Sequence, residues 1–314
     1  MNPVHLETLL AIVDEGSFDV AAAVLGISPS AVSQRIKALE SSTGRVLLRR
    51  ATPVTATEAG EILVQSARRM ALVQAETDAR LGHRLARVPL SVAVNSDSLA
   101  TWFRRVLSDT ARRGDVALRI RIEDEARTLA MLRRGDVLGA VTREATPVSG
   151  CESSFLGTMR YFPVAAAHIA ESFHSGHLTW ETMPLVGYGP NDQVLDDAMR
   201  ERFIDSAVVC ARVSQIPSSE GYLEAVRVGL GWGLLPQAQA LPLLAAKELV
   251  LLDDSPLDID LYWQRWRLES EVLGELTRSV IEAEATWKPS SQFAATARRG
   301  GYHKSAGTCL KLEL

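Results

Sequence analysis

Two helix-start signals separated by a short turn constrain the fold of this chain more than any other feature. Ser17 is suited to cap a helix over Phe18–Leu25, because its hydroxyl can accept hydrogen bonds from unpaired N–H groups. Gly26 supplies the backbone angles of a turn. Ser28 and Pro29 then begin the next helix, where the missing proline N–H costs nothing. With an amphipathic helix before them, these signals predict a helix-turn-helix.

The last of these helices, expected over Pro29–Glu40, carries polar groups suited to nucleic acid. Its apolar residues Val32, Ile36 and Leu39 face a core. The opposite face offers hydroxyls, an amide and a cation, which can reach base edges and phosphates. The residues that we expect to contact DNA are Ser28, Ser30, Ser33, Gln34, Arg35, Lys37, Arg49, Arg50 and Thr57. A three-helix scaffold with a solvated polar face is the alternative.

The segment after this helix, Arg45–Thr57, alternates apolar and basic residues around Pro53 and predicts a two-stranded wing. Five basic residues lie between Ser33 and Arg50 against the single acid Glu40, although the whole chain has a net charge of −4. Positive charge is therefore concentrated where a surface facing double-stranded DNA needs it, and a helix of this kind docks in a major groove.

Residues 57–87 predict one long helix, because they contain no proline and only two glycines. Their apolar residues form a stripe: Ala59, Ile62, Leu63, Ala67, Met70, Val73 and Leu81. An exposed helix of this length must bury its stripe, and a second copy of the same helix is the economical partner. We therefore expect a homodimer. Packing of the helix on the next domain is the alternative.

Beyond Pro89 the pattern changes to strands alternating with helices, which predicts α/β architecture with parallel strands. The expected strands are 90–95, 117–123, 137–142, 161–165, 185–188, 208–213 and 259–266. The expected helices are 99–112, 127–134, 196–203, 220–228 and 270–287. Two such lobes joined by crossing strands would enclose a cleft, and ligands of open α/β sheets bind where the strands end.

Polar residues follow several of these strands and open the helices after them. The candidate ligand-binding residues are Ser96, Asp97, Ser98, Trp102, Glu123, Asp124, Thr142, Ser214 and Ser218. Hydroxyls and N–H groups at a helix start can hold a carboxylate, whereas acids attract a cationic amine. The repeated acids indicate a cationic ligand. Each acid alone could be a helix cap or a surface group, and Trp102 could belong to the core.

Composition excludes several other classes of protein. The 314 residues suggest about two domains, and 46% are hydrophobic. No apolar run approaches the roughly 20 residues of a membrane span, and the N-terminus lacks a secretion signal. Cys151, Cys210 and Cys309 are scattered without metal-ligand spacing. No P-loop, GxSxG or HExxH motif is present. We expect a cytoplasmic protein that is not an enzyme and has no cofactor or metal.

The N-terminal residues resemble the signature of LysR-type transcriptional regulators. The resemblance lies in Ser17-Phe18, Ala21-Ala22, the run Ser28–Glu40, Gly44, Leu47, Arg49 and Thr57–Gly60. It implies a winged helix-turn-helix over 1–60, a linker helix over 57–87 and a two-lobed effector domain over 88–287, similar to periplasmic solute-binding proteins. The implied first lobe is about 88–160 with 266–287, and the second about 161–265. Residues 288–314 fit neither domain and are expected to be a disordered tail.

A finer resemblance concerns the branch of the family that responds to basic amino acids, of the LysG and ArgP (IciA) type. It lies in the stretches 95–103, 132–144 and 262–266. It implies sensing of lysine and arginine, with histidine as a further candidate, and activation of a basic-amino-acid exporter gene. It also implies assembly to a homotetramer and contact with RNA polymerase. A LysR-type regulator of another small metabolite, such as an organic acid, is the alternative.

Overall fold

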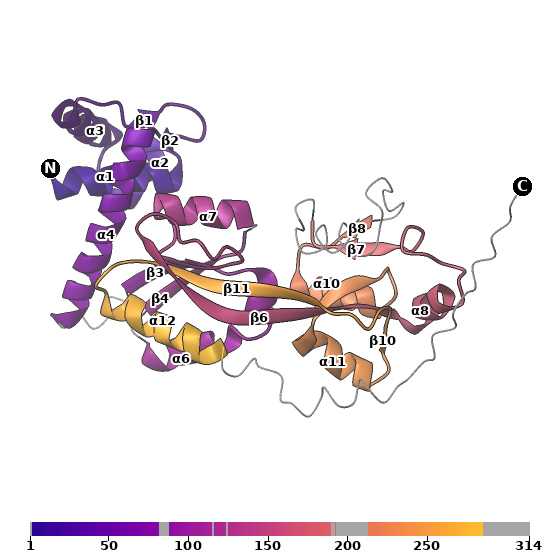
Figure 1. The fold of residues 1–314 in the computed structure, drawn as a ribbon. Helices are drawn as coiled ribbons and strands as arrows, with labels where there is room; N and C mark the ends of the chain where they lie inside the picture. Colours follow the sequence, from indigo (N-terminus) through magenta and orange to yellow (C-terminus); the bar gives the residue numbers. More distant parts are fainter. Residues whose placement is uncertain are drawn as a thin grey trace, which may run out of the picture.

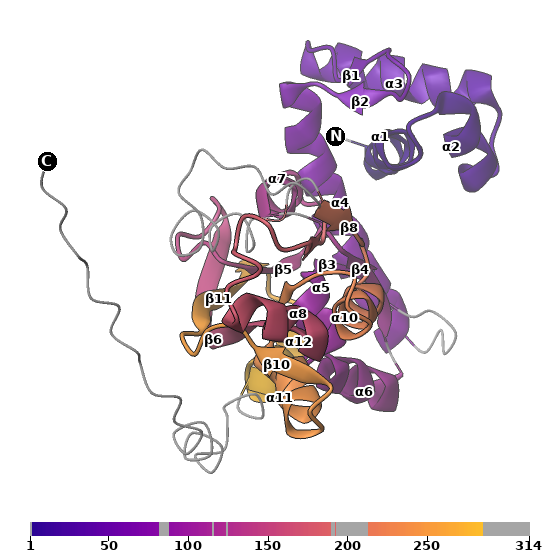
Figure 2. The ribbon, with the colours of Figure 1, turned by 90° about the vertical axis from the view of Figure 1, so that its right-hand side faces the viewer.

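The computed structural model describes residues 2–81, 88–114, 116–123, 125–189, 192 and 213–284. A small N-terminal head stands away from a larger α/β domain, and one long helix joins them (Figures 1 and 2). The elements of the head are α1 (Pro3–Glu15), α2 (Phe18–Leu25), α3 (Pro29–Thr43), β1 (Leu48–Arg49) and β2 (Thr55–Ala56). The joining helix is α4 (Glu58–Arg80).

The helix-turn-helix and its wing are confirmed, and the expected caps form. The hydroxyls of Ser17 and Ser28 accept hydrogen bonds from the third N–H group after each of them. The antiparallel pair β1–β2 is the wing. At Gly60 the first turn of α4 lies so close to the carbonyl of Leu47 that a Cβ atom would collide with it. This glycine therefore lets α4 cross the base of the wing.

Helix α4 has two apolar sides with different surroundings. Val64 and Ala67 join the core of the head, and Leu72 is buried in the core of the α/β domain. A second row remains exposed and consists of Ile62, Met70, Val73 and Leu81. Intramolecular packing, the alternative for this helix, thus accounts for one side, while the exposed row is free for the dimer contact that we still predict. The helix is described as far as Arg80, and residues 82–87 of the expected helix lie outside the described residues.

The α/β domain is built on a sheet with the strand order β10-β6-β11-β5-β3-β4, and β9 also pairs with β6. Its first part consists of β3 (Val88–Ala93), β4 (Val116–Arg121) and β5 (Gly139–Thr142), which are parallel to one another. The helices of this first lobe are α5 (Ser96–Ala100), α6 (Arg104–Arg113), α7 (Glu125–Arg134) and α12 (Glu271–Glu284). Helices α6 and α12 cover one face of the sheet and α7 the other (Figure 1).

Two long antiparallel strands, β6 (Cys151–Ala166) and β11 (Leu257–Trp266), run from the first lobe into the second. The register of the pair shifts between Leu261 and Tyr262, and from Tyr262 onward β11 pairs with β5. The return to the first lobe therefore occurs within β11, a few residues before the expected boundary at 265. The expected strand 161–165 is only the end of β6, which begins at Cys151.

The second lobe contains α8 (Ala167–His174), α10 (Ser219–Arg227) and α11 (Gln237–Ala245). Its strands are β7 (Leu185–Gly187), β8 (Val213–Gln215), β9 (Gly233–Pro236) and β10 (Leu249–Leu251). A core of its own packs between them, with Val186, Val226 and Leu235 fully buried. The expected helix 196–203 and most of the expected strand 208–213 lie outside the described residues, as do Asp124 and the segment 288–314.

One predicted helix, 99–112, is wrong in its extent. The structure has α5, a turn and then α6, because the hydroxyl of Thr101 donates to the carbonyl of Asp97 at 2.6 Å and the chain leaves helical geometry there. The turn places Trp102 and Phe103 in the core, with 6% and 0% of their surface exposed. This interruption separates the polar start of α5, which faces the second lobe, from the amphipathic helix α6.

Candidate functional site: DNA-binding surface and effector cleft

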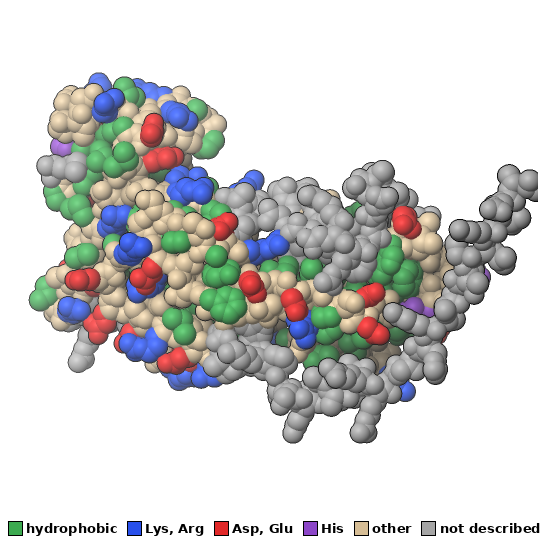
Figure 3. All heavy atoms as spheres, in the orientation of Figure 1, with side chains coloured by type: hydrophobic (Ala, Val, Ile, Leu, Met, Phe, Trp, Pro, Cys, Tyr) green, Lys and Arg blue, Asp and Glu red, His purple; other side chains and the backbone are tan. Residues whose placement is uncertain are grey.

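The outer surface of α3 and the wing present the polar groups predicted for DNA contact. The side chains of Ser30, Gln34, Lys37, Arg49 and Arg50 are exposed, and Ser33 is half-buried. Lys and Arg side chains are visible at this end of the head in Figure 3. The guanidinium of Arg50 lies 5.8 Å from the centre of the Phe18 ring, which orients it as a cation–π pair. These residues remain our candidates for phosphate and base contact.

Three residues of the predicted set have structural partners within the head. Arg35 is half-buried, and its Nη1 donates to the hydroxyl of Thr8 on α1 at 3.2 Å. Ser28 accepts from the N–H of Ala31 as the cap of α3. Thr57 donates to the carbonyl of Val46 at 2.7 Å and accepts from the N–H of Gly60. Arg35 therefore joins α3 to α1, because its position turns it away from the outer face of α3.

The start of α5 meets the second lobe at a cluster of hydroxyl and carboxyl groups. The hydroxyl of Tyr161 on β6 donates to Oδ2 of Asp97 at 3.0 Å. Ser96 and Tyr188, which follows β7, form a hydrogen bond between their hydroxyls. The carboxylate of Asp192 accepts from the backbone N–H of Tyr188 at 2.8 Å. Helix α10 packs against α5 beside them, so the cluster lies between the two lobes.

Burial governs the ionisation of Asp97. It raises the pKa of this carboxyl from 3.8 to about 6; the Tyr161 hydrogen bond opposes the rise, and the Asp192 charge adds to it. Burial also holds the pKa of Tyr161 well above its usual value, reinforced by Asp97, whereas nearby Arg143 acts in the opposite direction. The interlobe cluster thus combines two mutually repelling carboxyl groups with the charge of Arg143, an arrangement that a zwitterion with an extra positive charge would complement.

The structure brings together only part of the predicted effector set. Ser96 and Asp97 lie in the cluster, and Ser98 is fully buried with no hydrogen-bond partner for its hydroxyl among the described residues. Ser218 is exposed and caps α10 by accepting from Gly221, and Ser214 is a half-buried residue of β8. These residues of the predicted effector set lie at or near the junction of the two lobes, and their role in ligand binding stays a prediction.

Three other residues of the predicted effector-binding set lie in different surroundings. Glu123 forms an ion pair of 3.3 Å with Arg127, one turn further along, and is not among the charges that act on Asp97. Trp102 packs in the core of the first lobe, and it also lines the groove between α6, β6 and α11 that is described below. Thr142 is 1% exposed, and its hydroxyl accepts from the N–H of Glu144 in the turn after β5.

Sequence reasoning missed four residues of the cluster: Tyr161, Tyr188, Asp192 and Tyr222. Burial raises the pKa of Tyr222, and the Asp192 carboxylate adds to the rise. The Tyr222 hydroxyl accepts a hydrogen bond of 2.9 Å from the backbone N–H of Leu234. The sequence did contain a signal for two of these residues, because Tyr161 and Tyr188 lie within the expected strands 161–165 and 185–188.

A groove of about 1300 Å³ lies elsewhere, between the start of α6, the middle of β6 and α11. Its polar lining includes Arg104, Arg105, Gln237 and Gln239, and none of the Asp97 cluster belongs to it. Among the described residues, no group of His, Cys, Asp or Glu is arranged to hold a metal ion, and no helix is long and apolar enough to cross a membrane.

A winged helix-turn-helix joined by one helix to a two-lobed α/β domain with a polar interlobe cluster defines a class of proteins, the ligand-responsive DNA-binding regulators. Two family models match this chain: the bacterial regulatory helix-turn-helix protein, LysR family, over residues 3–61, and the LysR substrate binding domain over residues 83–284. The chain belongs to the LysR family.

Relatives and solved structures with similar sequences refine the comparison. The chain is 58% identical over 284 residues to the lysine export transcriptional regulatory protein LysG of Corynebacterium efficiens, covering 90% of this chain and 98% of the relative. Full-length LysG of Corynebacterium glutamicum with bound effector Arg matches with a TM-score of 0.75 and 54% identity, covering 91% and 99%. ArgP of Mycobacterium tuberculosis matches with a TM-score of 0.78 and 39% identity, covering 90% and 96%.

Proposed function

We propose that this protein is a transcriptional regulator that senses lysine or arginine in the cleft between its lobes and activates a gene for basic-amino-acid export. The observation that carries the proposal is the Asp97–Tyr161–Asp192 cluster where the two lobes meet. Support comes from the relatives, one named for lysine export and one solved with arginine bound.

The chemistry of the cleft favours a basic amino acid over an organic acid. An anionic ligand would be repelled by Asp97 and Asp192, whereas an amine or guanidinium would offset their mutual repulsion. We assign the ligand carboxylate to Arg143 and the N–H groups at the start of α5, and its α-amine to Asp97. Asp192 then faces the distal cation. The sequence placed Glu123 and Asp124 among the candidate acids for a cationic ligand, and Asp192 was not among them.

Binding at this position would bias the arrangement of the lobes. Contacts from α5 on one side and Tyr188 and α10 on the other are made together only when the lobes are close. A ligand shifts such an equilibrium only to the extent that it binds one arrangement more tightly. The proposed output is altered engagement of promoter DNA by paired heads, with pairing through the exposed row of α4.

The test is calorimetry of the full-length protein with each of the twenty amino acids and with a panel of organic acids. Lysine and arginine should bind, and both should raise the melting temperature by mass action. Binding of an organic acid with no response to lysine or arginine would establish the alternative regulator. Expression from a basic-amino-acid exporter promoter fused to a reporter should then rise with added lysine.

A further inference from the structure

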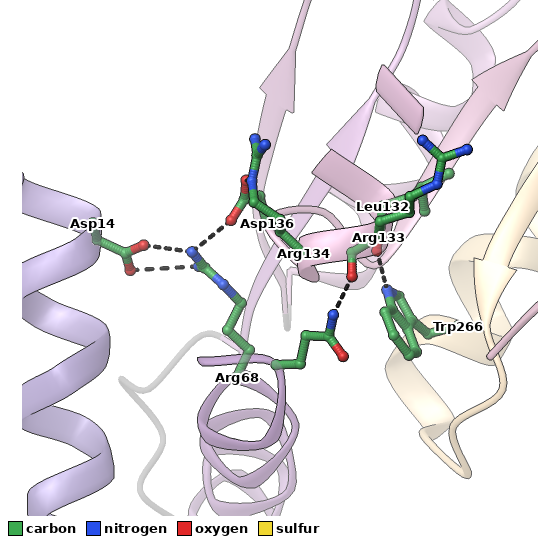
Figure 4. A network of polar contacts seen from close by, with 8 residues as sticks. Asp14, Arg68, Leu132, Arg133, Arg134, Asp136 and Trp266 are labelled. Atoms are coloured by element: carbon green, nitrogen blue, oxygen red, sulfur yellow. Dashed lines mark hydrogen bonds and ion pairs between the residues drawn. The ribbon is translucent and has the colours of Figure 1, made fainter. Parts of the chain in front are cut away.

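One arginine of α4 connects all three parts of the molecule. Nη2 of Arg68 lies 2.6 Å from Oδ1 of Asp14, near the end of α1, and 2.9 Å from Oδ1 of Asp136 in the first lobe. Figure 4 shows the guanidinium between the two carboxylates, with Asp14 on the head and Asp136 beyond the end of α7. Only 18% of the Arg68 side chain and 22% of the Asp136 side chain are exposed, against 40% for Asp14, so solvent screens the Asp136 pair less than a surface pair.

The turn that carries Asp136 has a fixed geometry and packs against α4. Gly135 has a φ of +74°, and the N–H groups of Gly135 and Asp136 bond back to the carbonyls of Leu132 and Met131, which ends α7 in a fixed geometry. A Cβ atom at Gly135 would lie 3.5 Å from Cγ of Gln65. Asp136 is also held by Nε of Arg134 at 2.8 Å. Its carboxylate therefore keeps one position relative to the first lobe.

The same turn leads through β5 toward the interlobe cluster of Asp97 and Tyr161. Strand β5 begins three residues after Asp136 and ends at Thr142, next to Arg143, whose charge acts on Tyr161. Hydrogen bonds to β3 on one side and β11 on the other stiffen this strand. A change at the Arg143 end of β5 would therefore displace the Asp136 end with it, if the strand moves as one element.

The remaining contacts of α4 with the first lobe do not reach the head. Arg69 stacks on the Trp266 ring at 4.2 Å, and Glu76 accepts from the hydroxyl of Ser270 at 2.5 Å. Arg80 pairs with Glu271 at 2.8 Å, with both side chains well exposed. These contacts anchor the helix to the lobe. Among the described ion pairs, Arg68 alone links α4 to both the head and the first lobe.

We propose that Arg68 is a regulatory joint: its paired contacts with Asp14 and Asp136 hold the head in one orientation on the first lobe, and effector-driven movement of that lobe reaches the head through them. Without the guanidinium, the carboxylates of Asp14 and Asp136 would face each other across the same gap and repel. The head would then sample several orientations about α4. The regulatory half of this inference rests on the proposed function.

The decisive experiment measures the distance between head and lobe in the protein without effector. Spin labels are placed at exposed Ser41 of α3 and exposed Arg119 of β4, with Cys210 and Cys309 replaced by serine and Cys151 left buried. Labelled chains are diluted with unlabelled protein, so that each dimer holds one labelled pair. Arg68→Met should broaden the distance distribution about twofold relative to the parent, whereas Arg80→Met, a matched loss of an ion pair on the same helix, should not.

A second measurement tests the coupling itself. The ratio of DNA dissociation constants with and without arginine should fall about threefold or more in Arg68→Met, while calorimetric affinity for arginine stays within about twofold of the parent value. An unchanged distance distribution, equal broadening in Arg80→Met, or an unchanged DNA ratio would overturn the inference. Absence of arginine and lysine binding by the parent would instead overturn the proposed function, and the distance measurement would still decide the role of Arg68 in holding the head.

Discussion

The hydroxyl of Tyr161, on the long strand β6, donates a hydrogen bond of 3.0 Å to the carboxyl of Asp97, at the start of α5. The two residues are far apart in the sequence and belong to elements that meet only where the lobes face each other. Because Tyr161 is fully buried and Asp97 half-buried, this bond fixes the position of a carboxyl group whose ionisation depends on its surroundings.

Loss of the Asp97 charge should weaken effector binding while leaving the DNA surface intact. We expect Asp97→Asn to lower lysine and arginine affinity about 10- to 100-fold, the usual worth of one charge-assisted hydrogen bond. DNA affinity without effector should be unchanged, since α3 and the wing lie in the other domain. Calorimetry measures the first quantity and fluorescence anisotropy the second. Glu171→Gln, on the exposed side of α8, is the charge-matched control. Equal effector affinity in Asp97→Asn and the parent would refute the assigned role.

Effector binding should also depend on pH. The pKa of Asp97 in the free protein is about 6, and the ionised form attracts the cationic ligand. Between pH 7.5 and pH 5 the ionised fraction falls, so that affinity for lysine should decrease about tenfold. Titrations at several pH values would show this, and the dependence should largely disappear in Asp97→Asn. A flat profile for the parent protein would contradict the prediction.

The Asp97 carboxyl group also affects how folding stability depends on pH. Its effect has the opposite sign to that of an acid whose pKa is lowered by an ion pair. Its pKa is higher in the folded state than the ordinary value of 3.8, so the folded state binds the proton more tightly. Its contribution therefore favours folding below about pH 4 and is lost as the pH rises through about 6. Without effector, Asp97→Asn should be more stable than the parent at pH 7.5, by at most about 3 kcal/mol. Thermal melts should show the gap narrowing below pH 6 and closing below about pH 4; a constant gap would exclude this cause.

Two neighbouring cations of α3 should behave differently when they are removed. Lys37 is exposed on the outer face, and Lys37→Ala should weaken binding to all DNA sequences and lower the slope of the salt dependence by about one. Arg35 instead donates to Thr8, so Arg35→Met should lower the free energy of unfolding by about 1–2 kcal/mol. Anisotropy at several salt concentrations and chemical denaturation would separate the two. If Arg35→Met instead weakened DNA binding and Lys37→Ala lowered the free energy of unfolding, Arg35 would be the residue that contacts DNA.

The exposed row of α4 should form the contact between two copies. Val73 is 57% exposed in the single chain, and Val73→Glu should shift the protein from dimer toward monomer because it places a charge in an apolar helix contact. Sedimentation equilibrium would measure the dissociation constant. Gln74→Glu adds the same charge at the next, exposed position and should have a much smaller effect. If both variants had the same dimer dissociation constant, α4 would not form the interface.

The head could be predicted almost residue by residue, because its signals are local. Ser17 and Ser28 cap the helices where expected, and α2 spans the predicted range Phe18–Leu25. The cleft could be predicted only in part. The start of α5 follows from its strand–helix junction, but its partners Tyr161 and Asp192 come from distant segments whose meeting depends on how β6 crosses between the lobes.

The sequence by itself determined the helix-turn-helix, the wing and the alternation of strands and helices, since caps, turns and hydrophobic periodicity act over a few residues. It also determined that acids would lie near the strand ends. Only the tertiary structure decided which arginines face outward and which acids share the cleft. Arg35 and Arg68 look like ordinary helix-surface cations in the sequence, yet one joins α3 to α1 and the other joins head, linker and lobe. The reason is physical: the partner of a charged side chain is set by where distant elements pack, and local sequence carries no record of that packing.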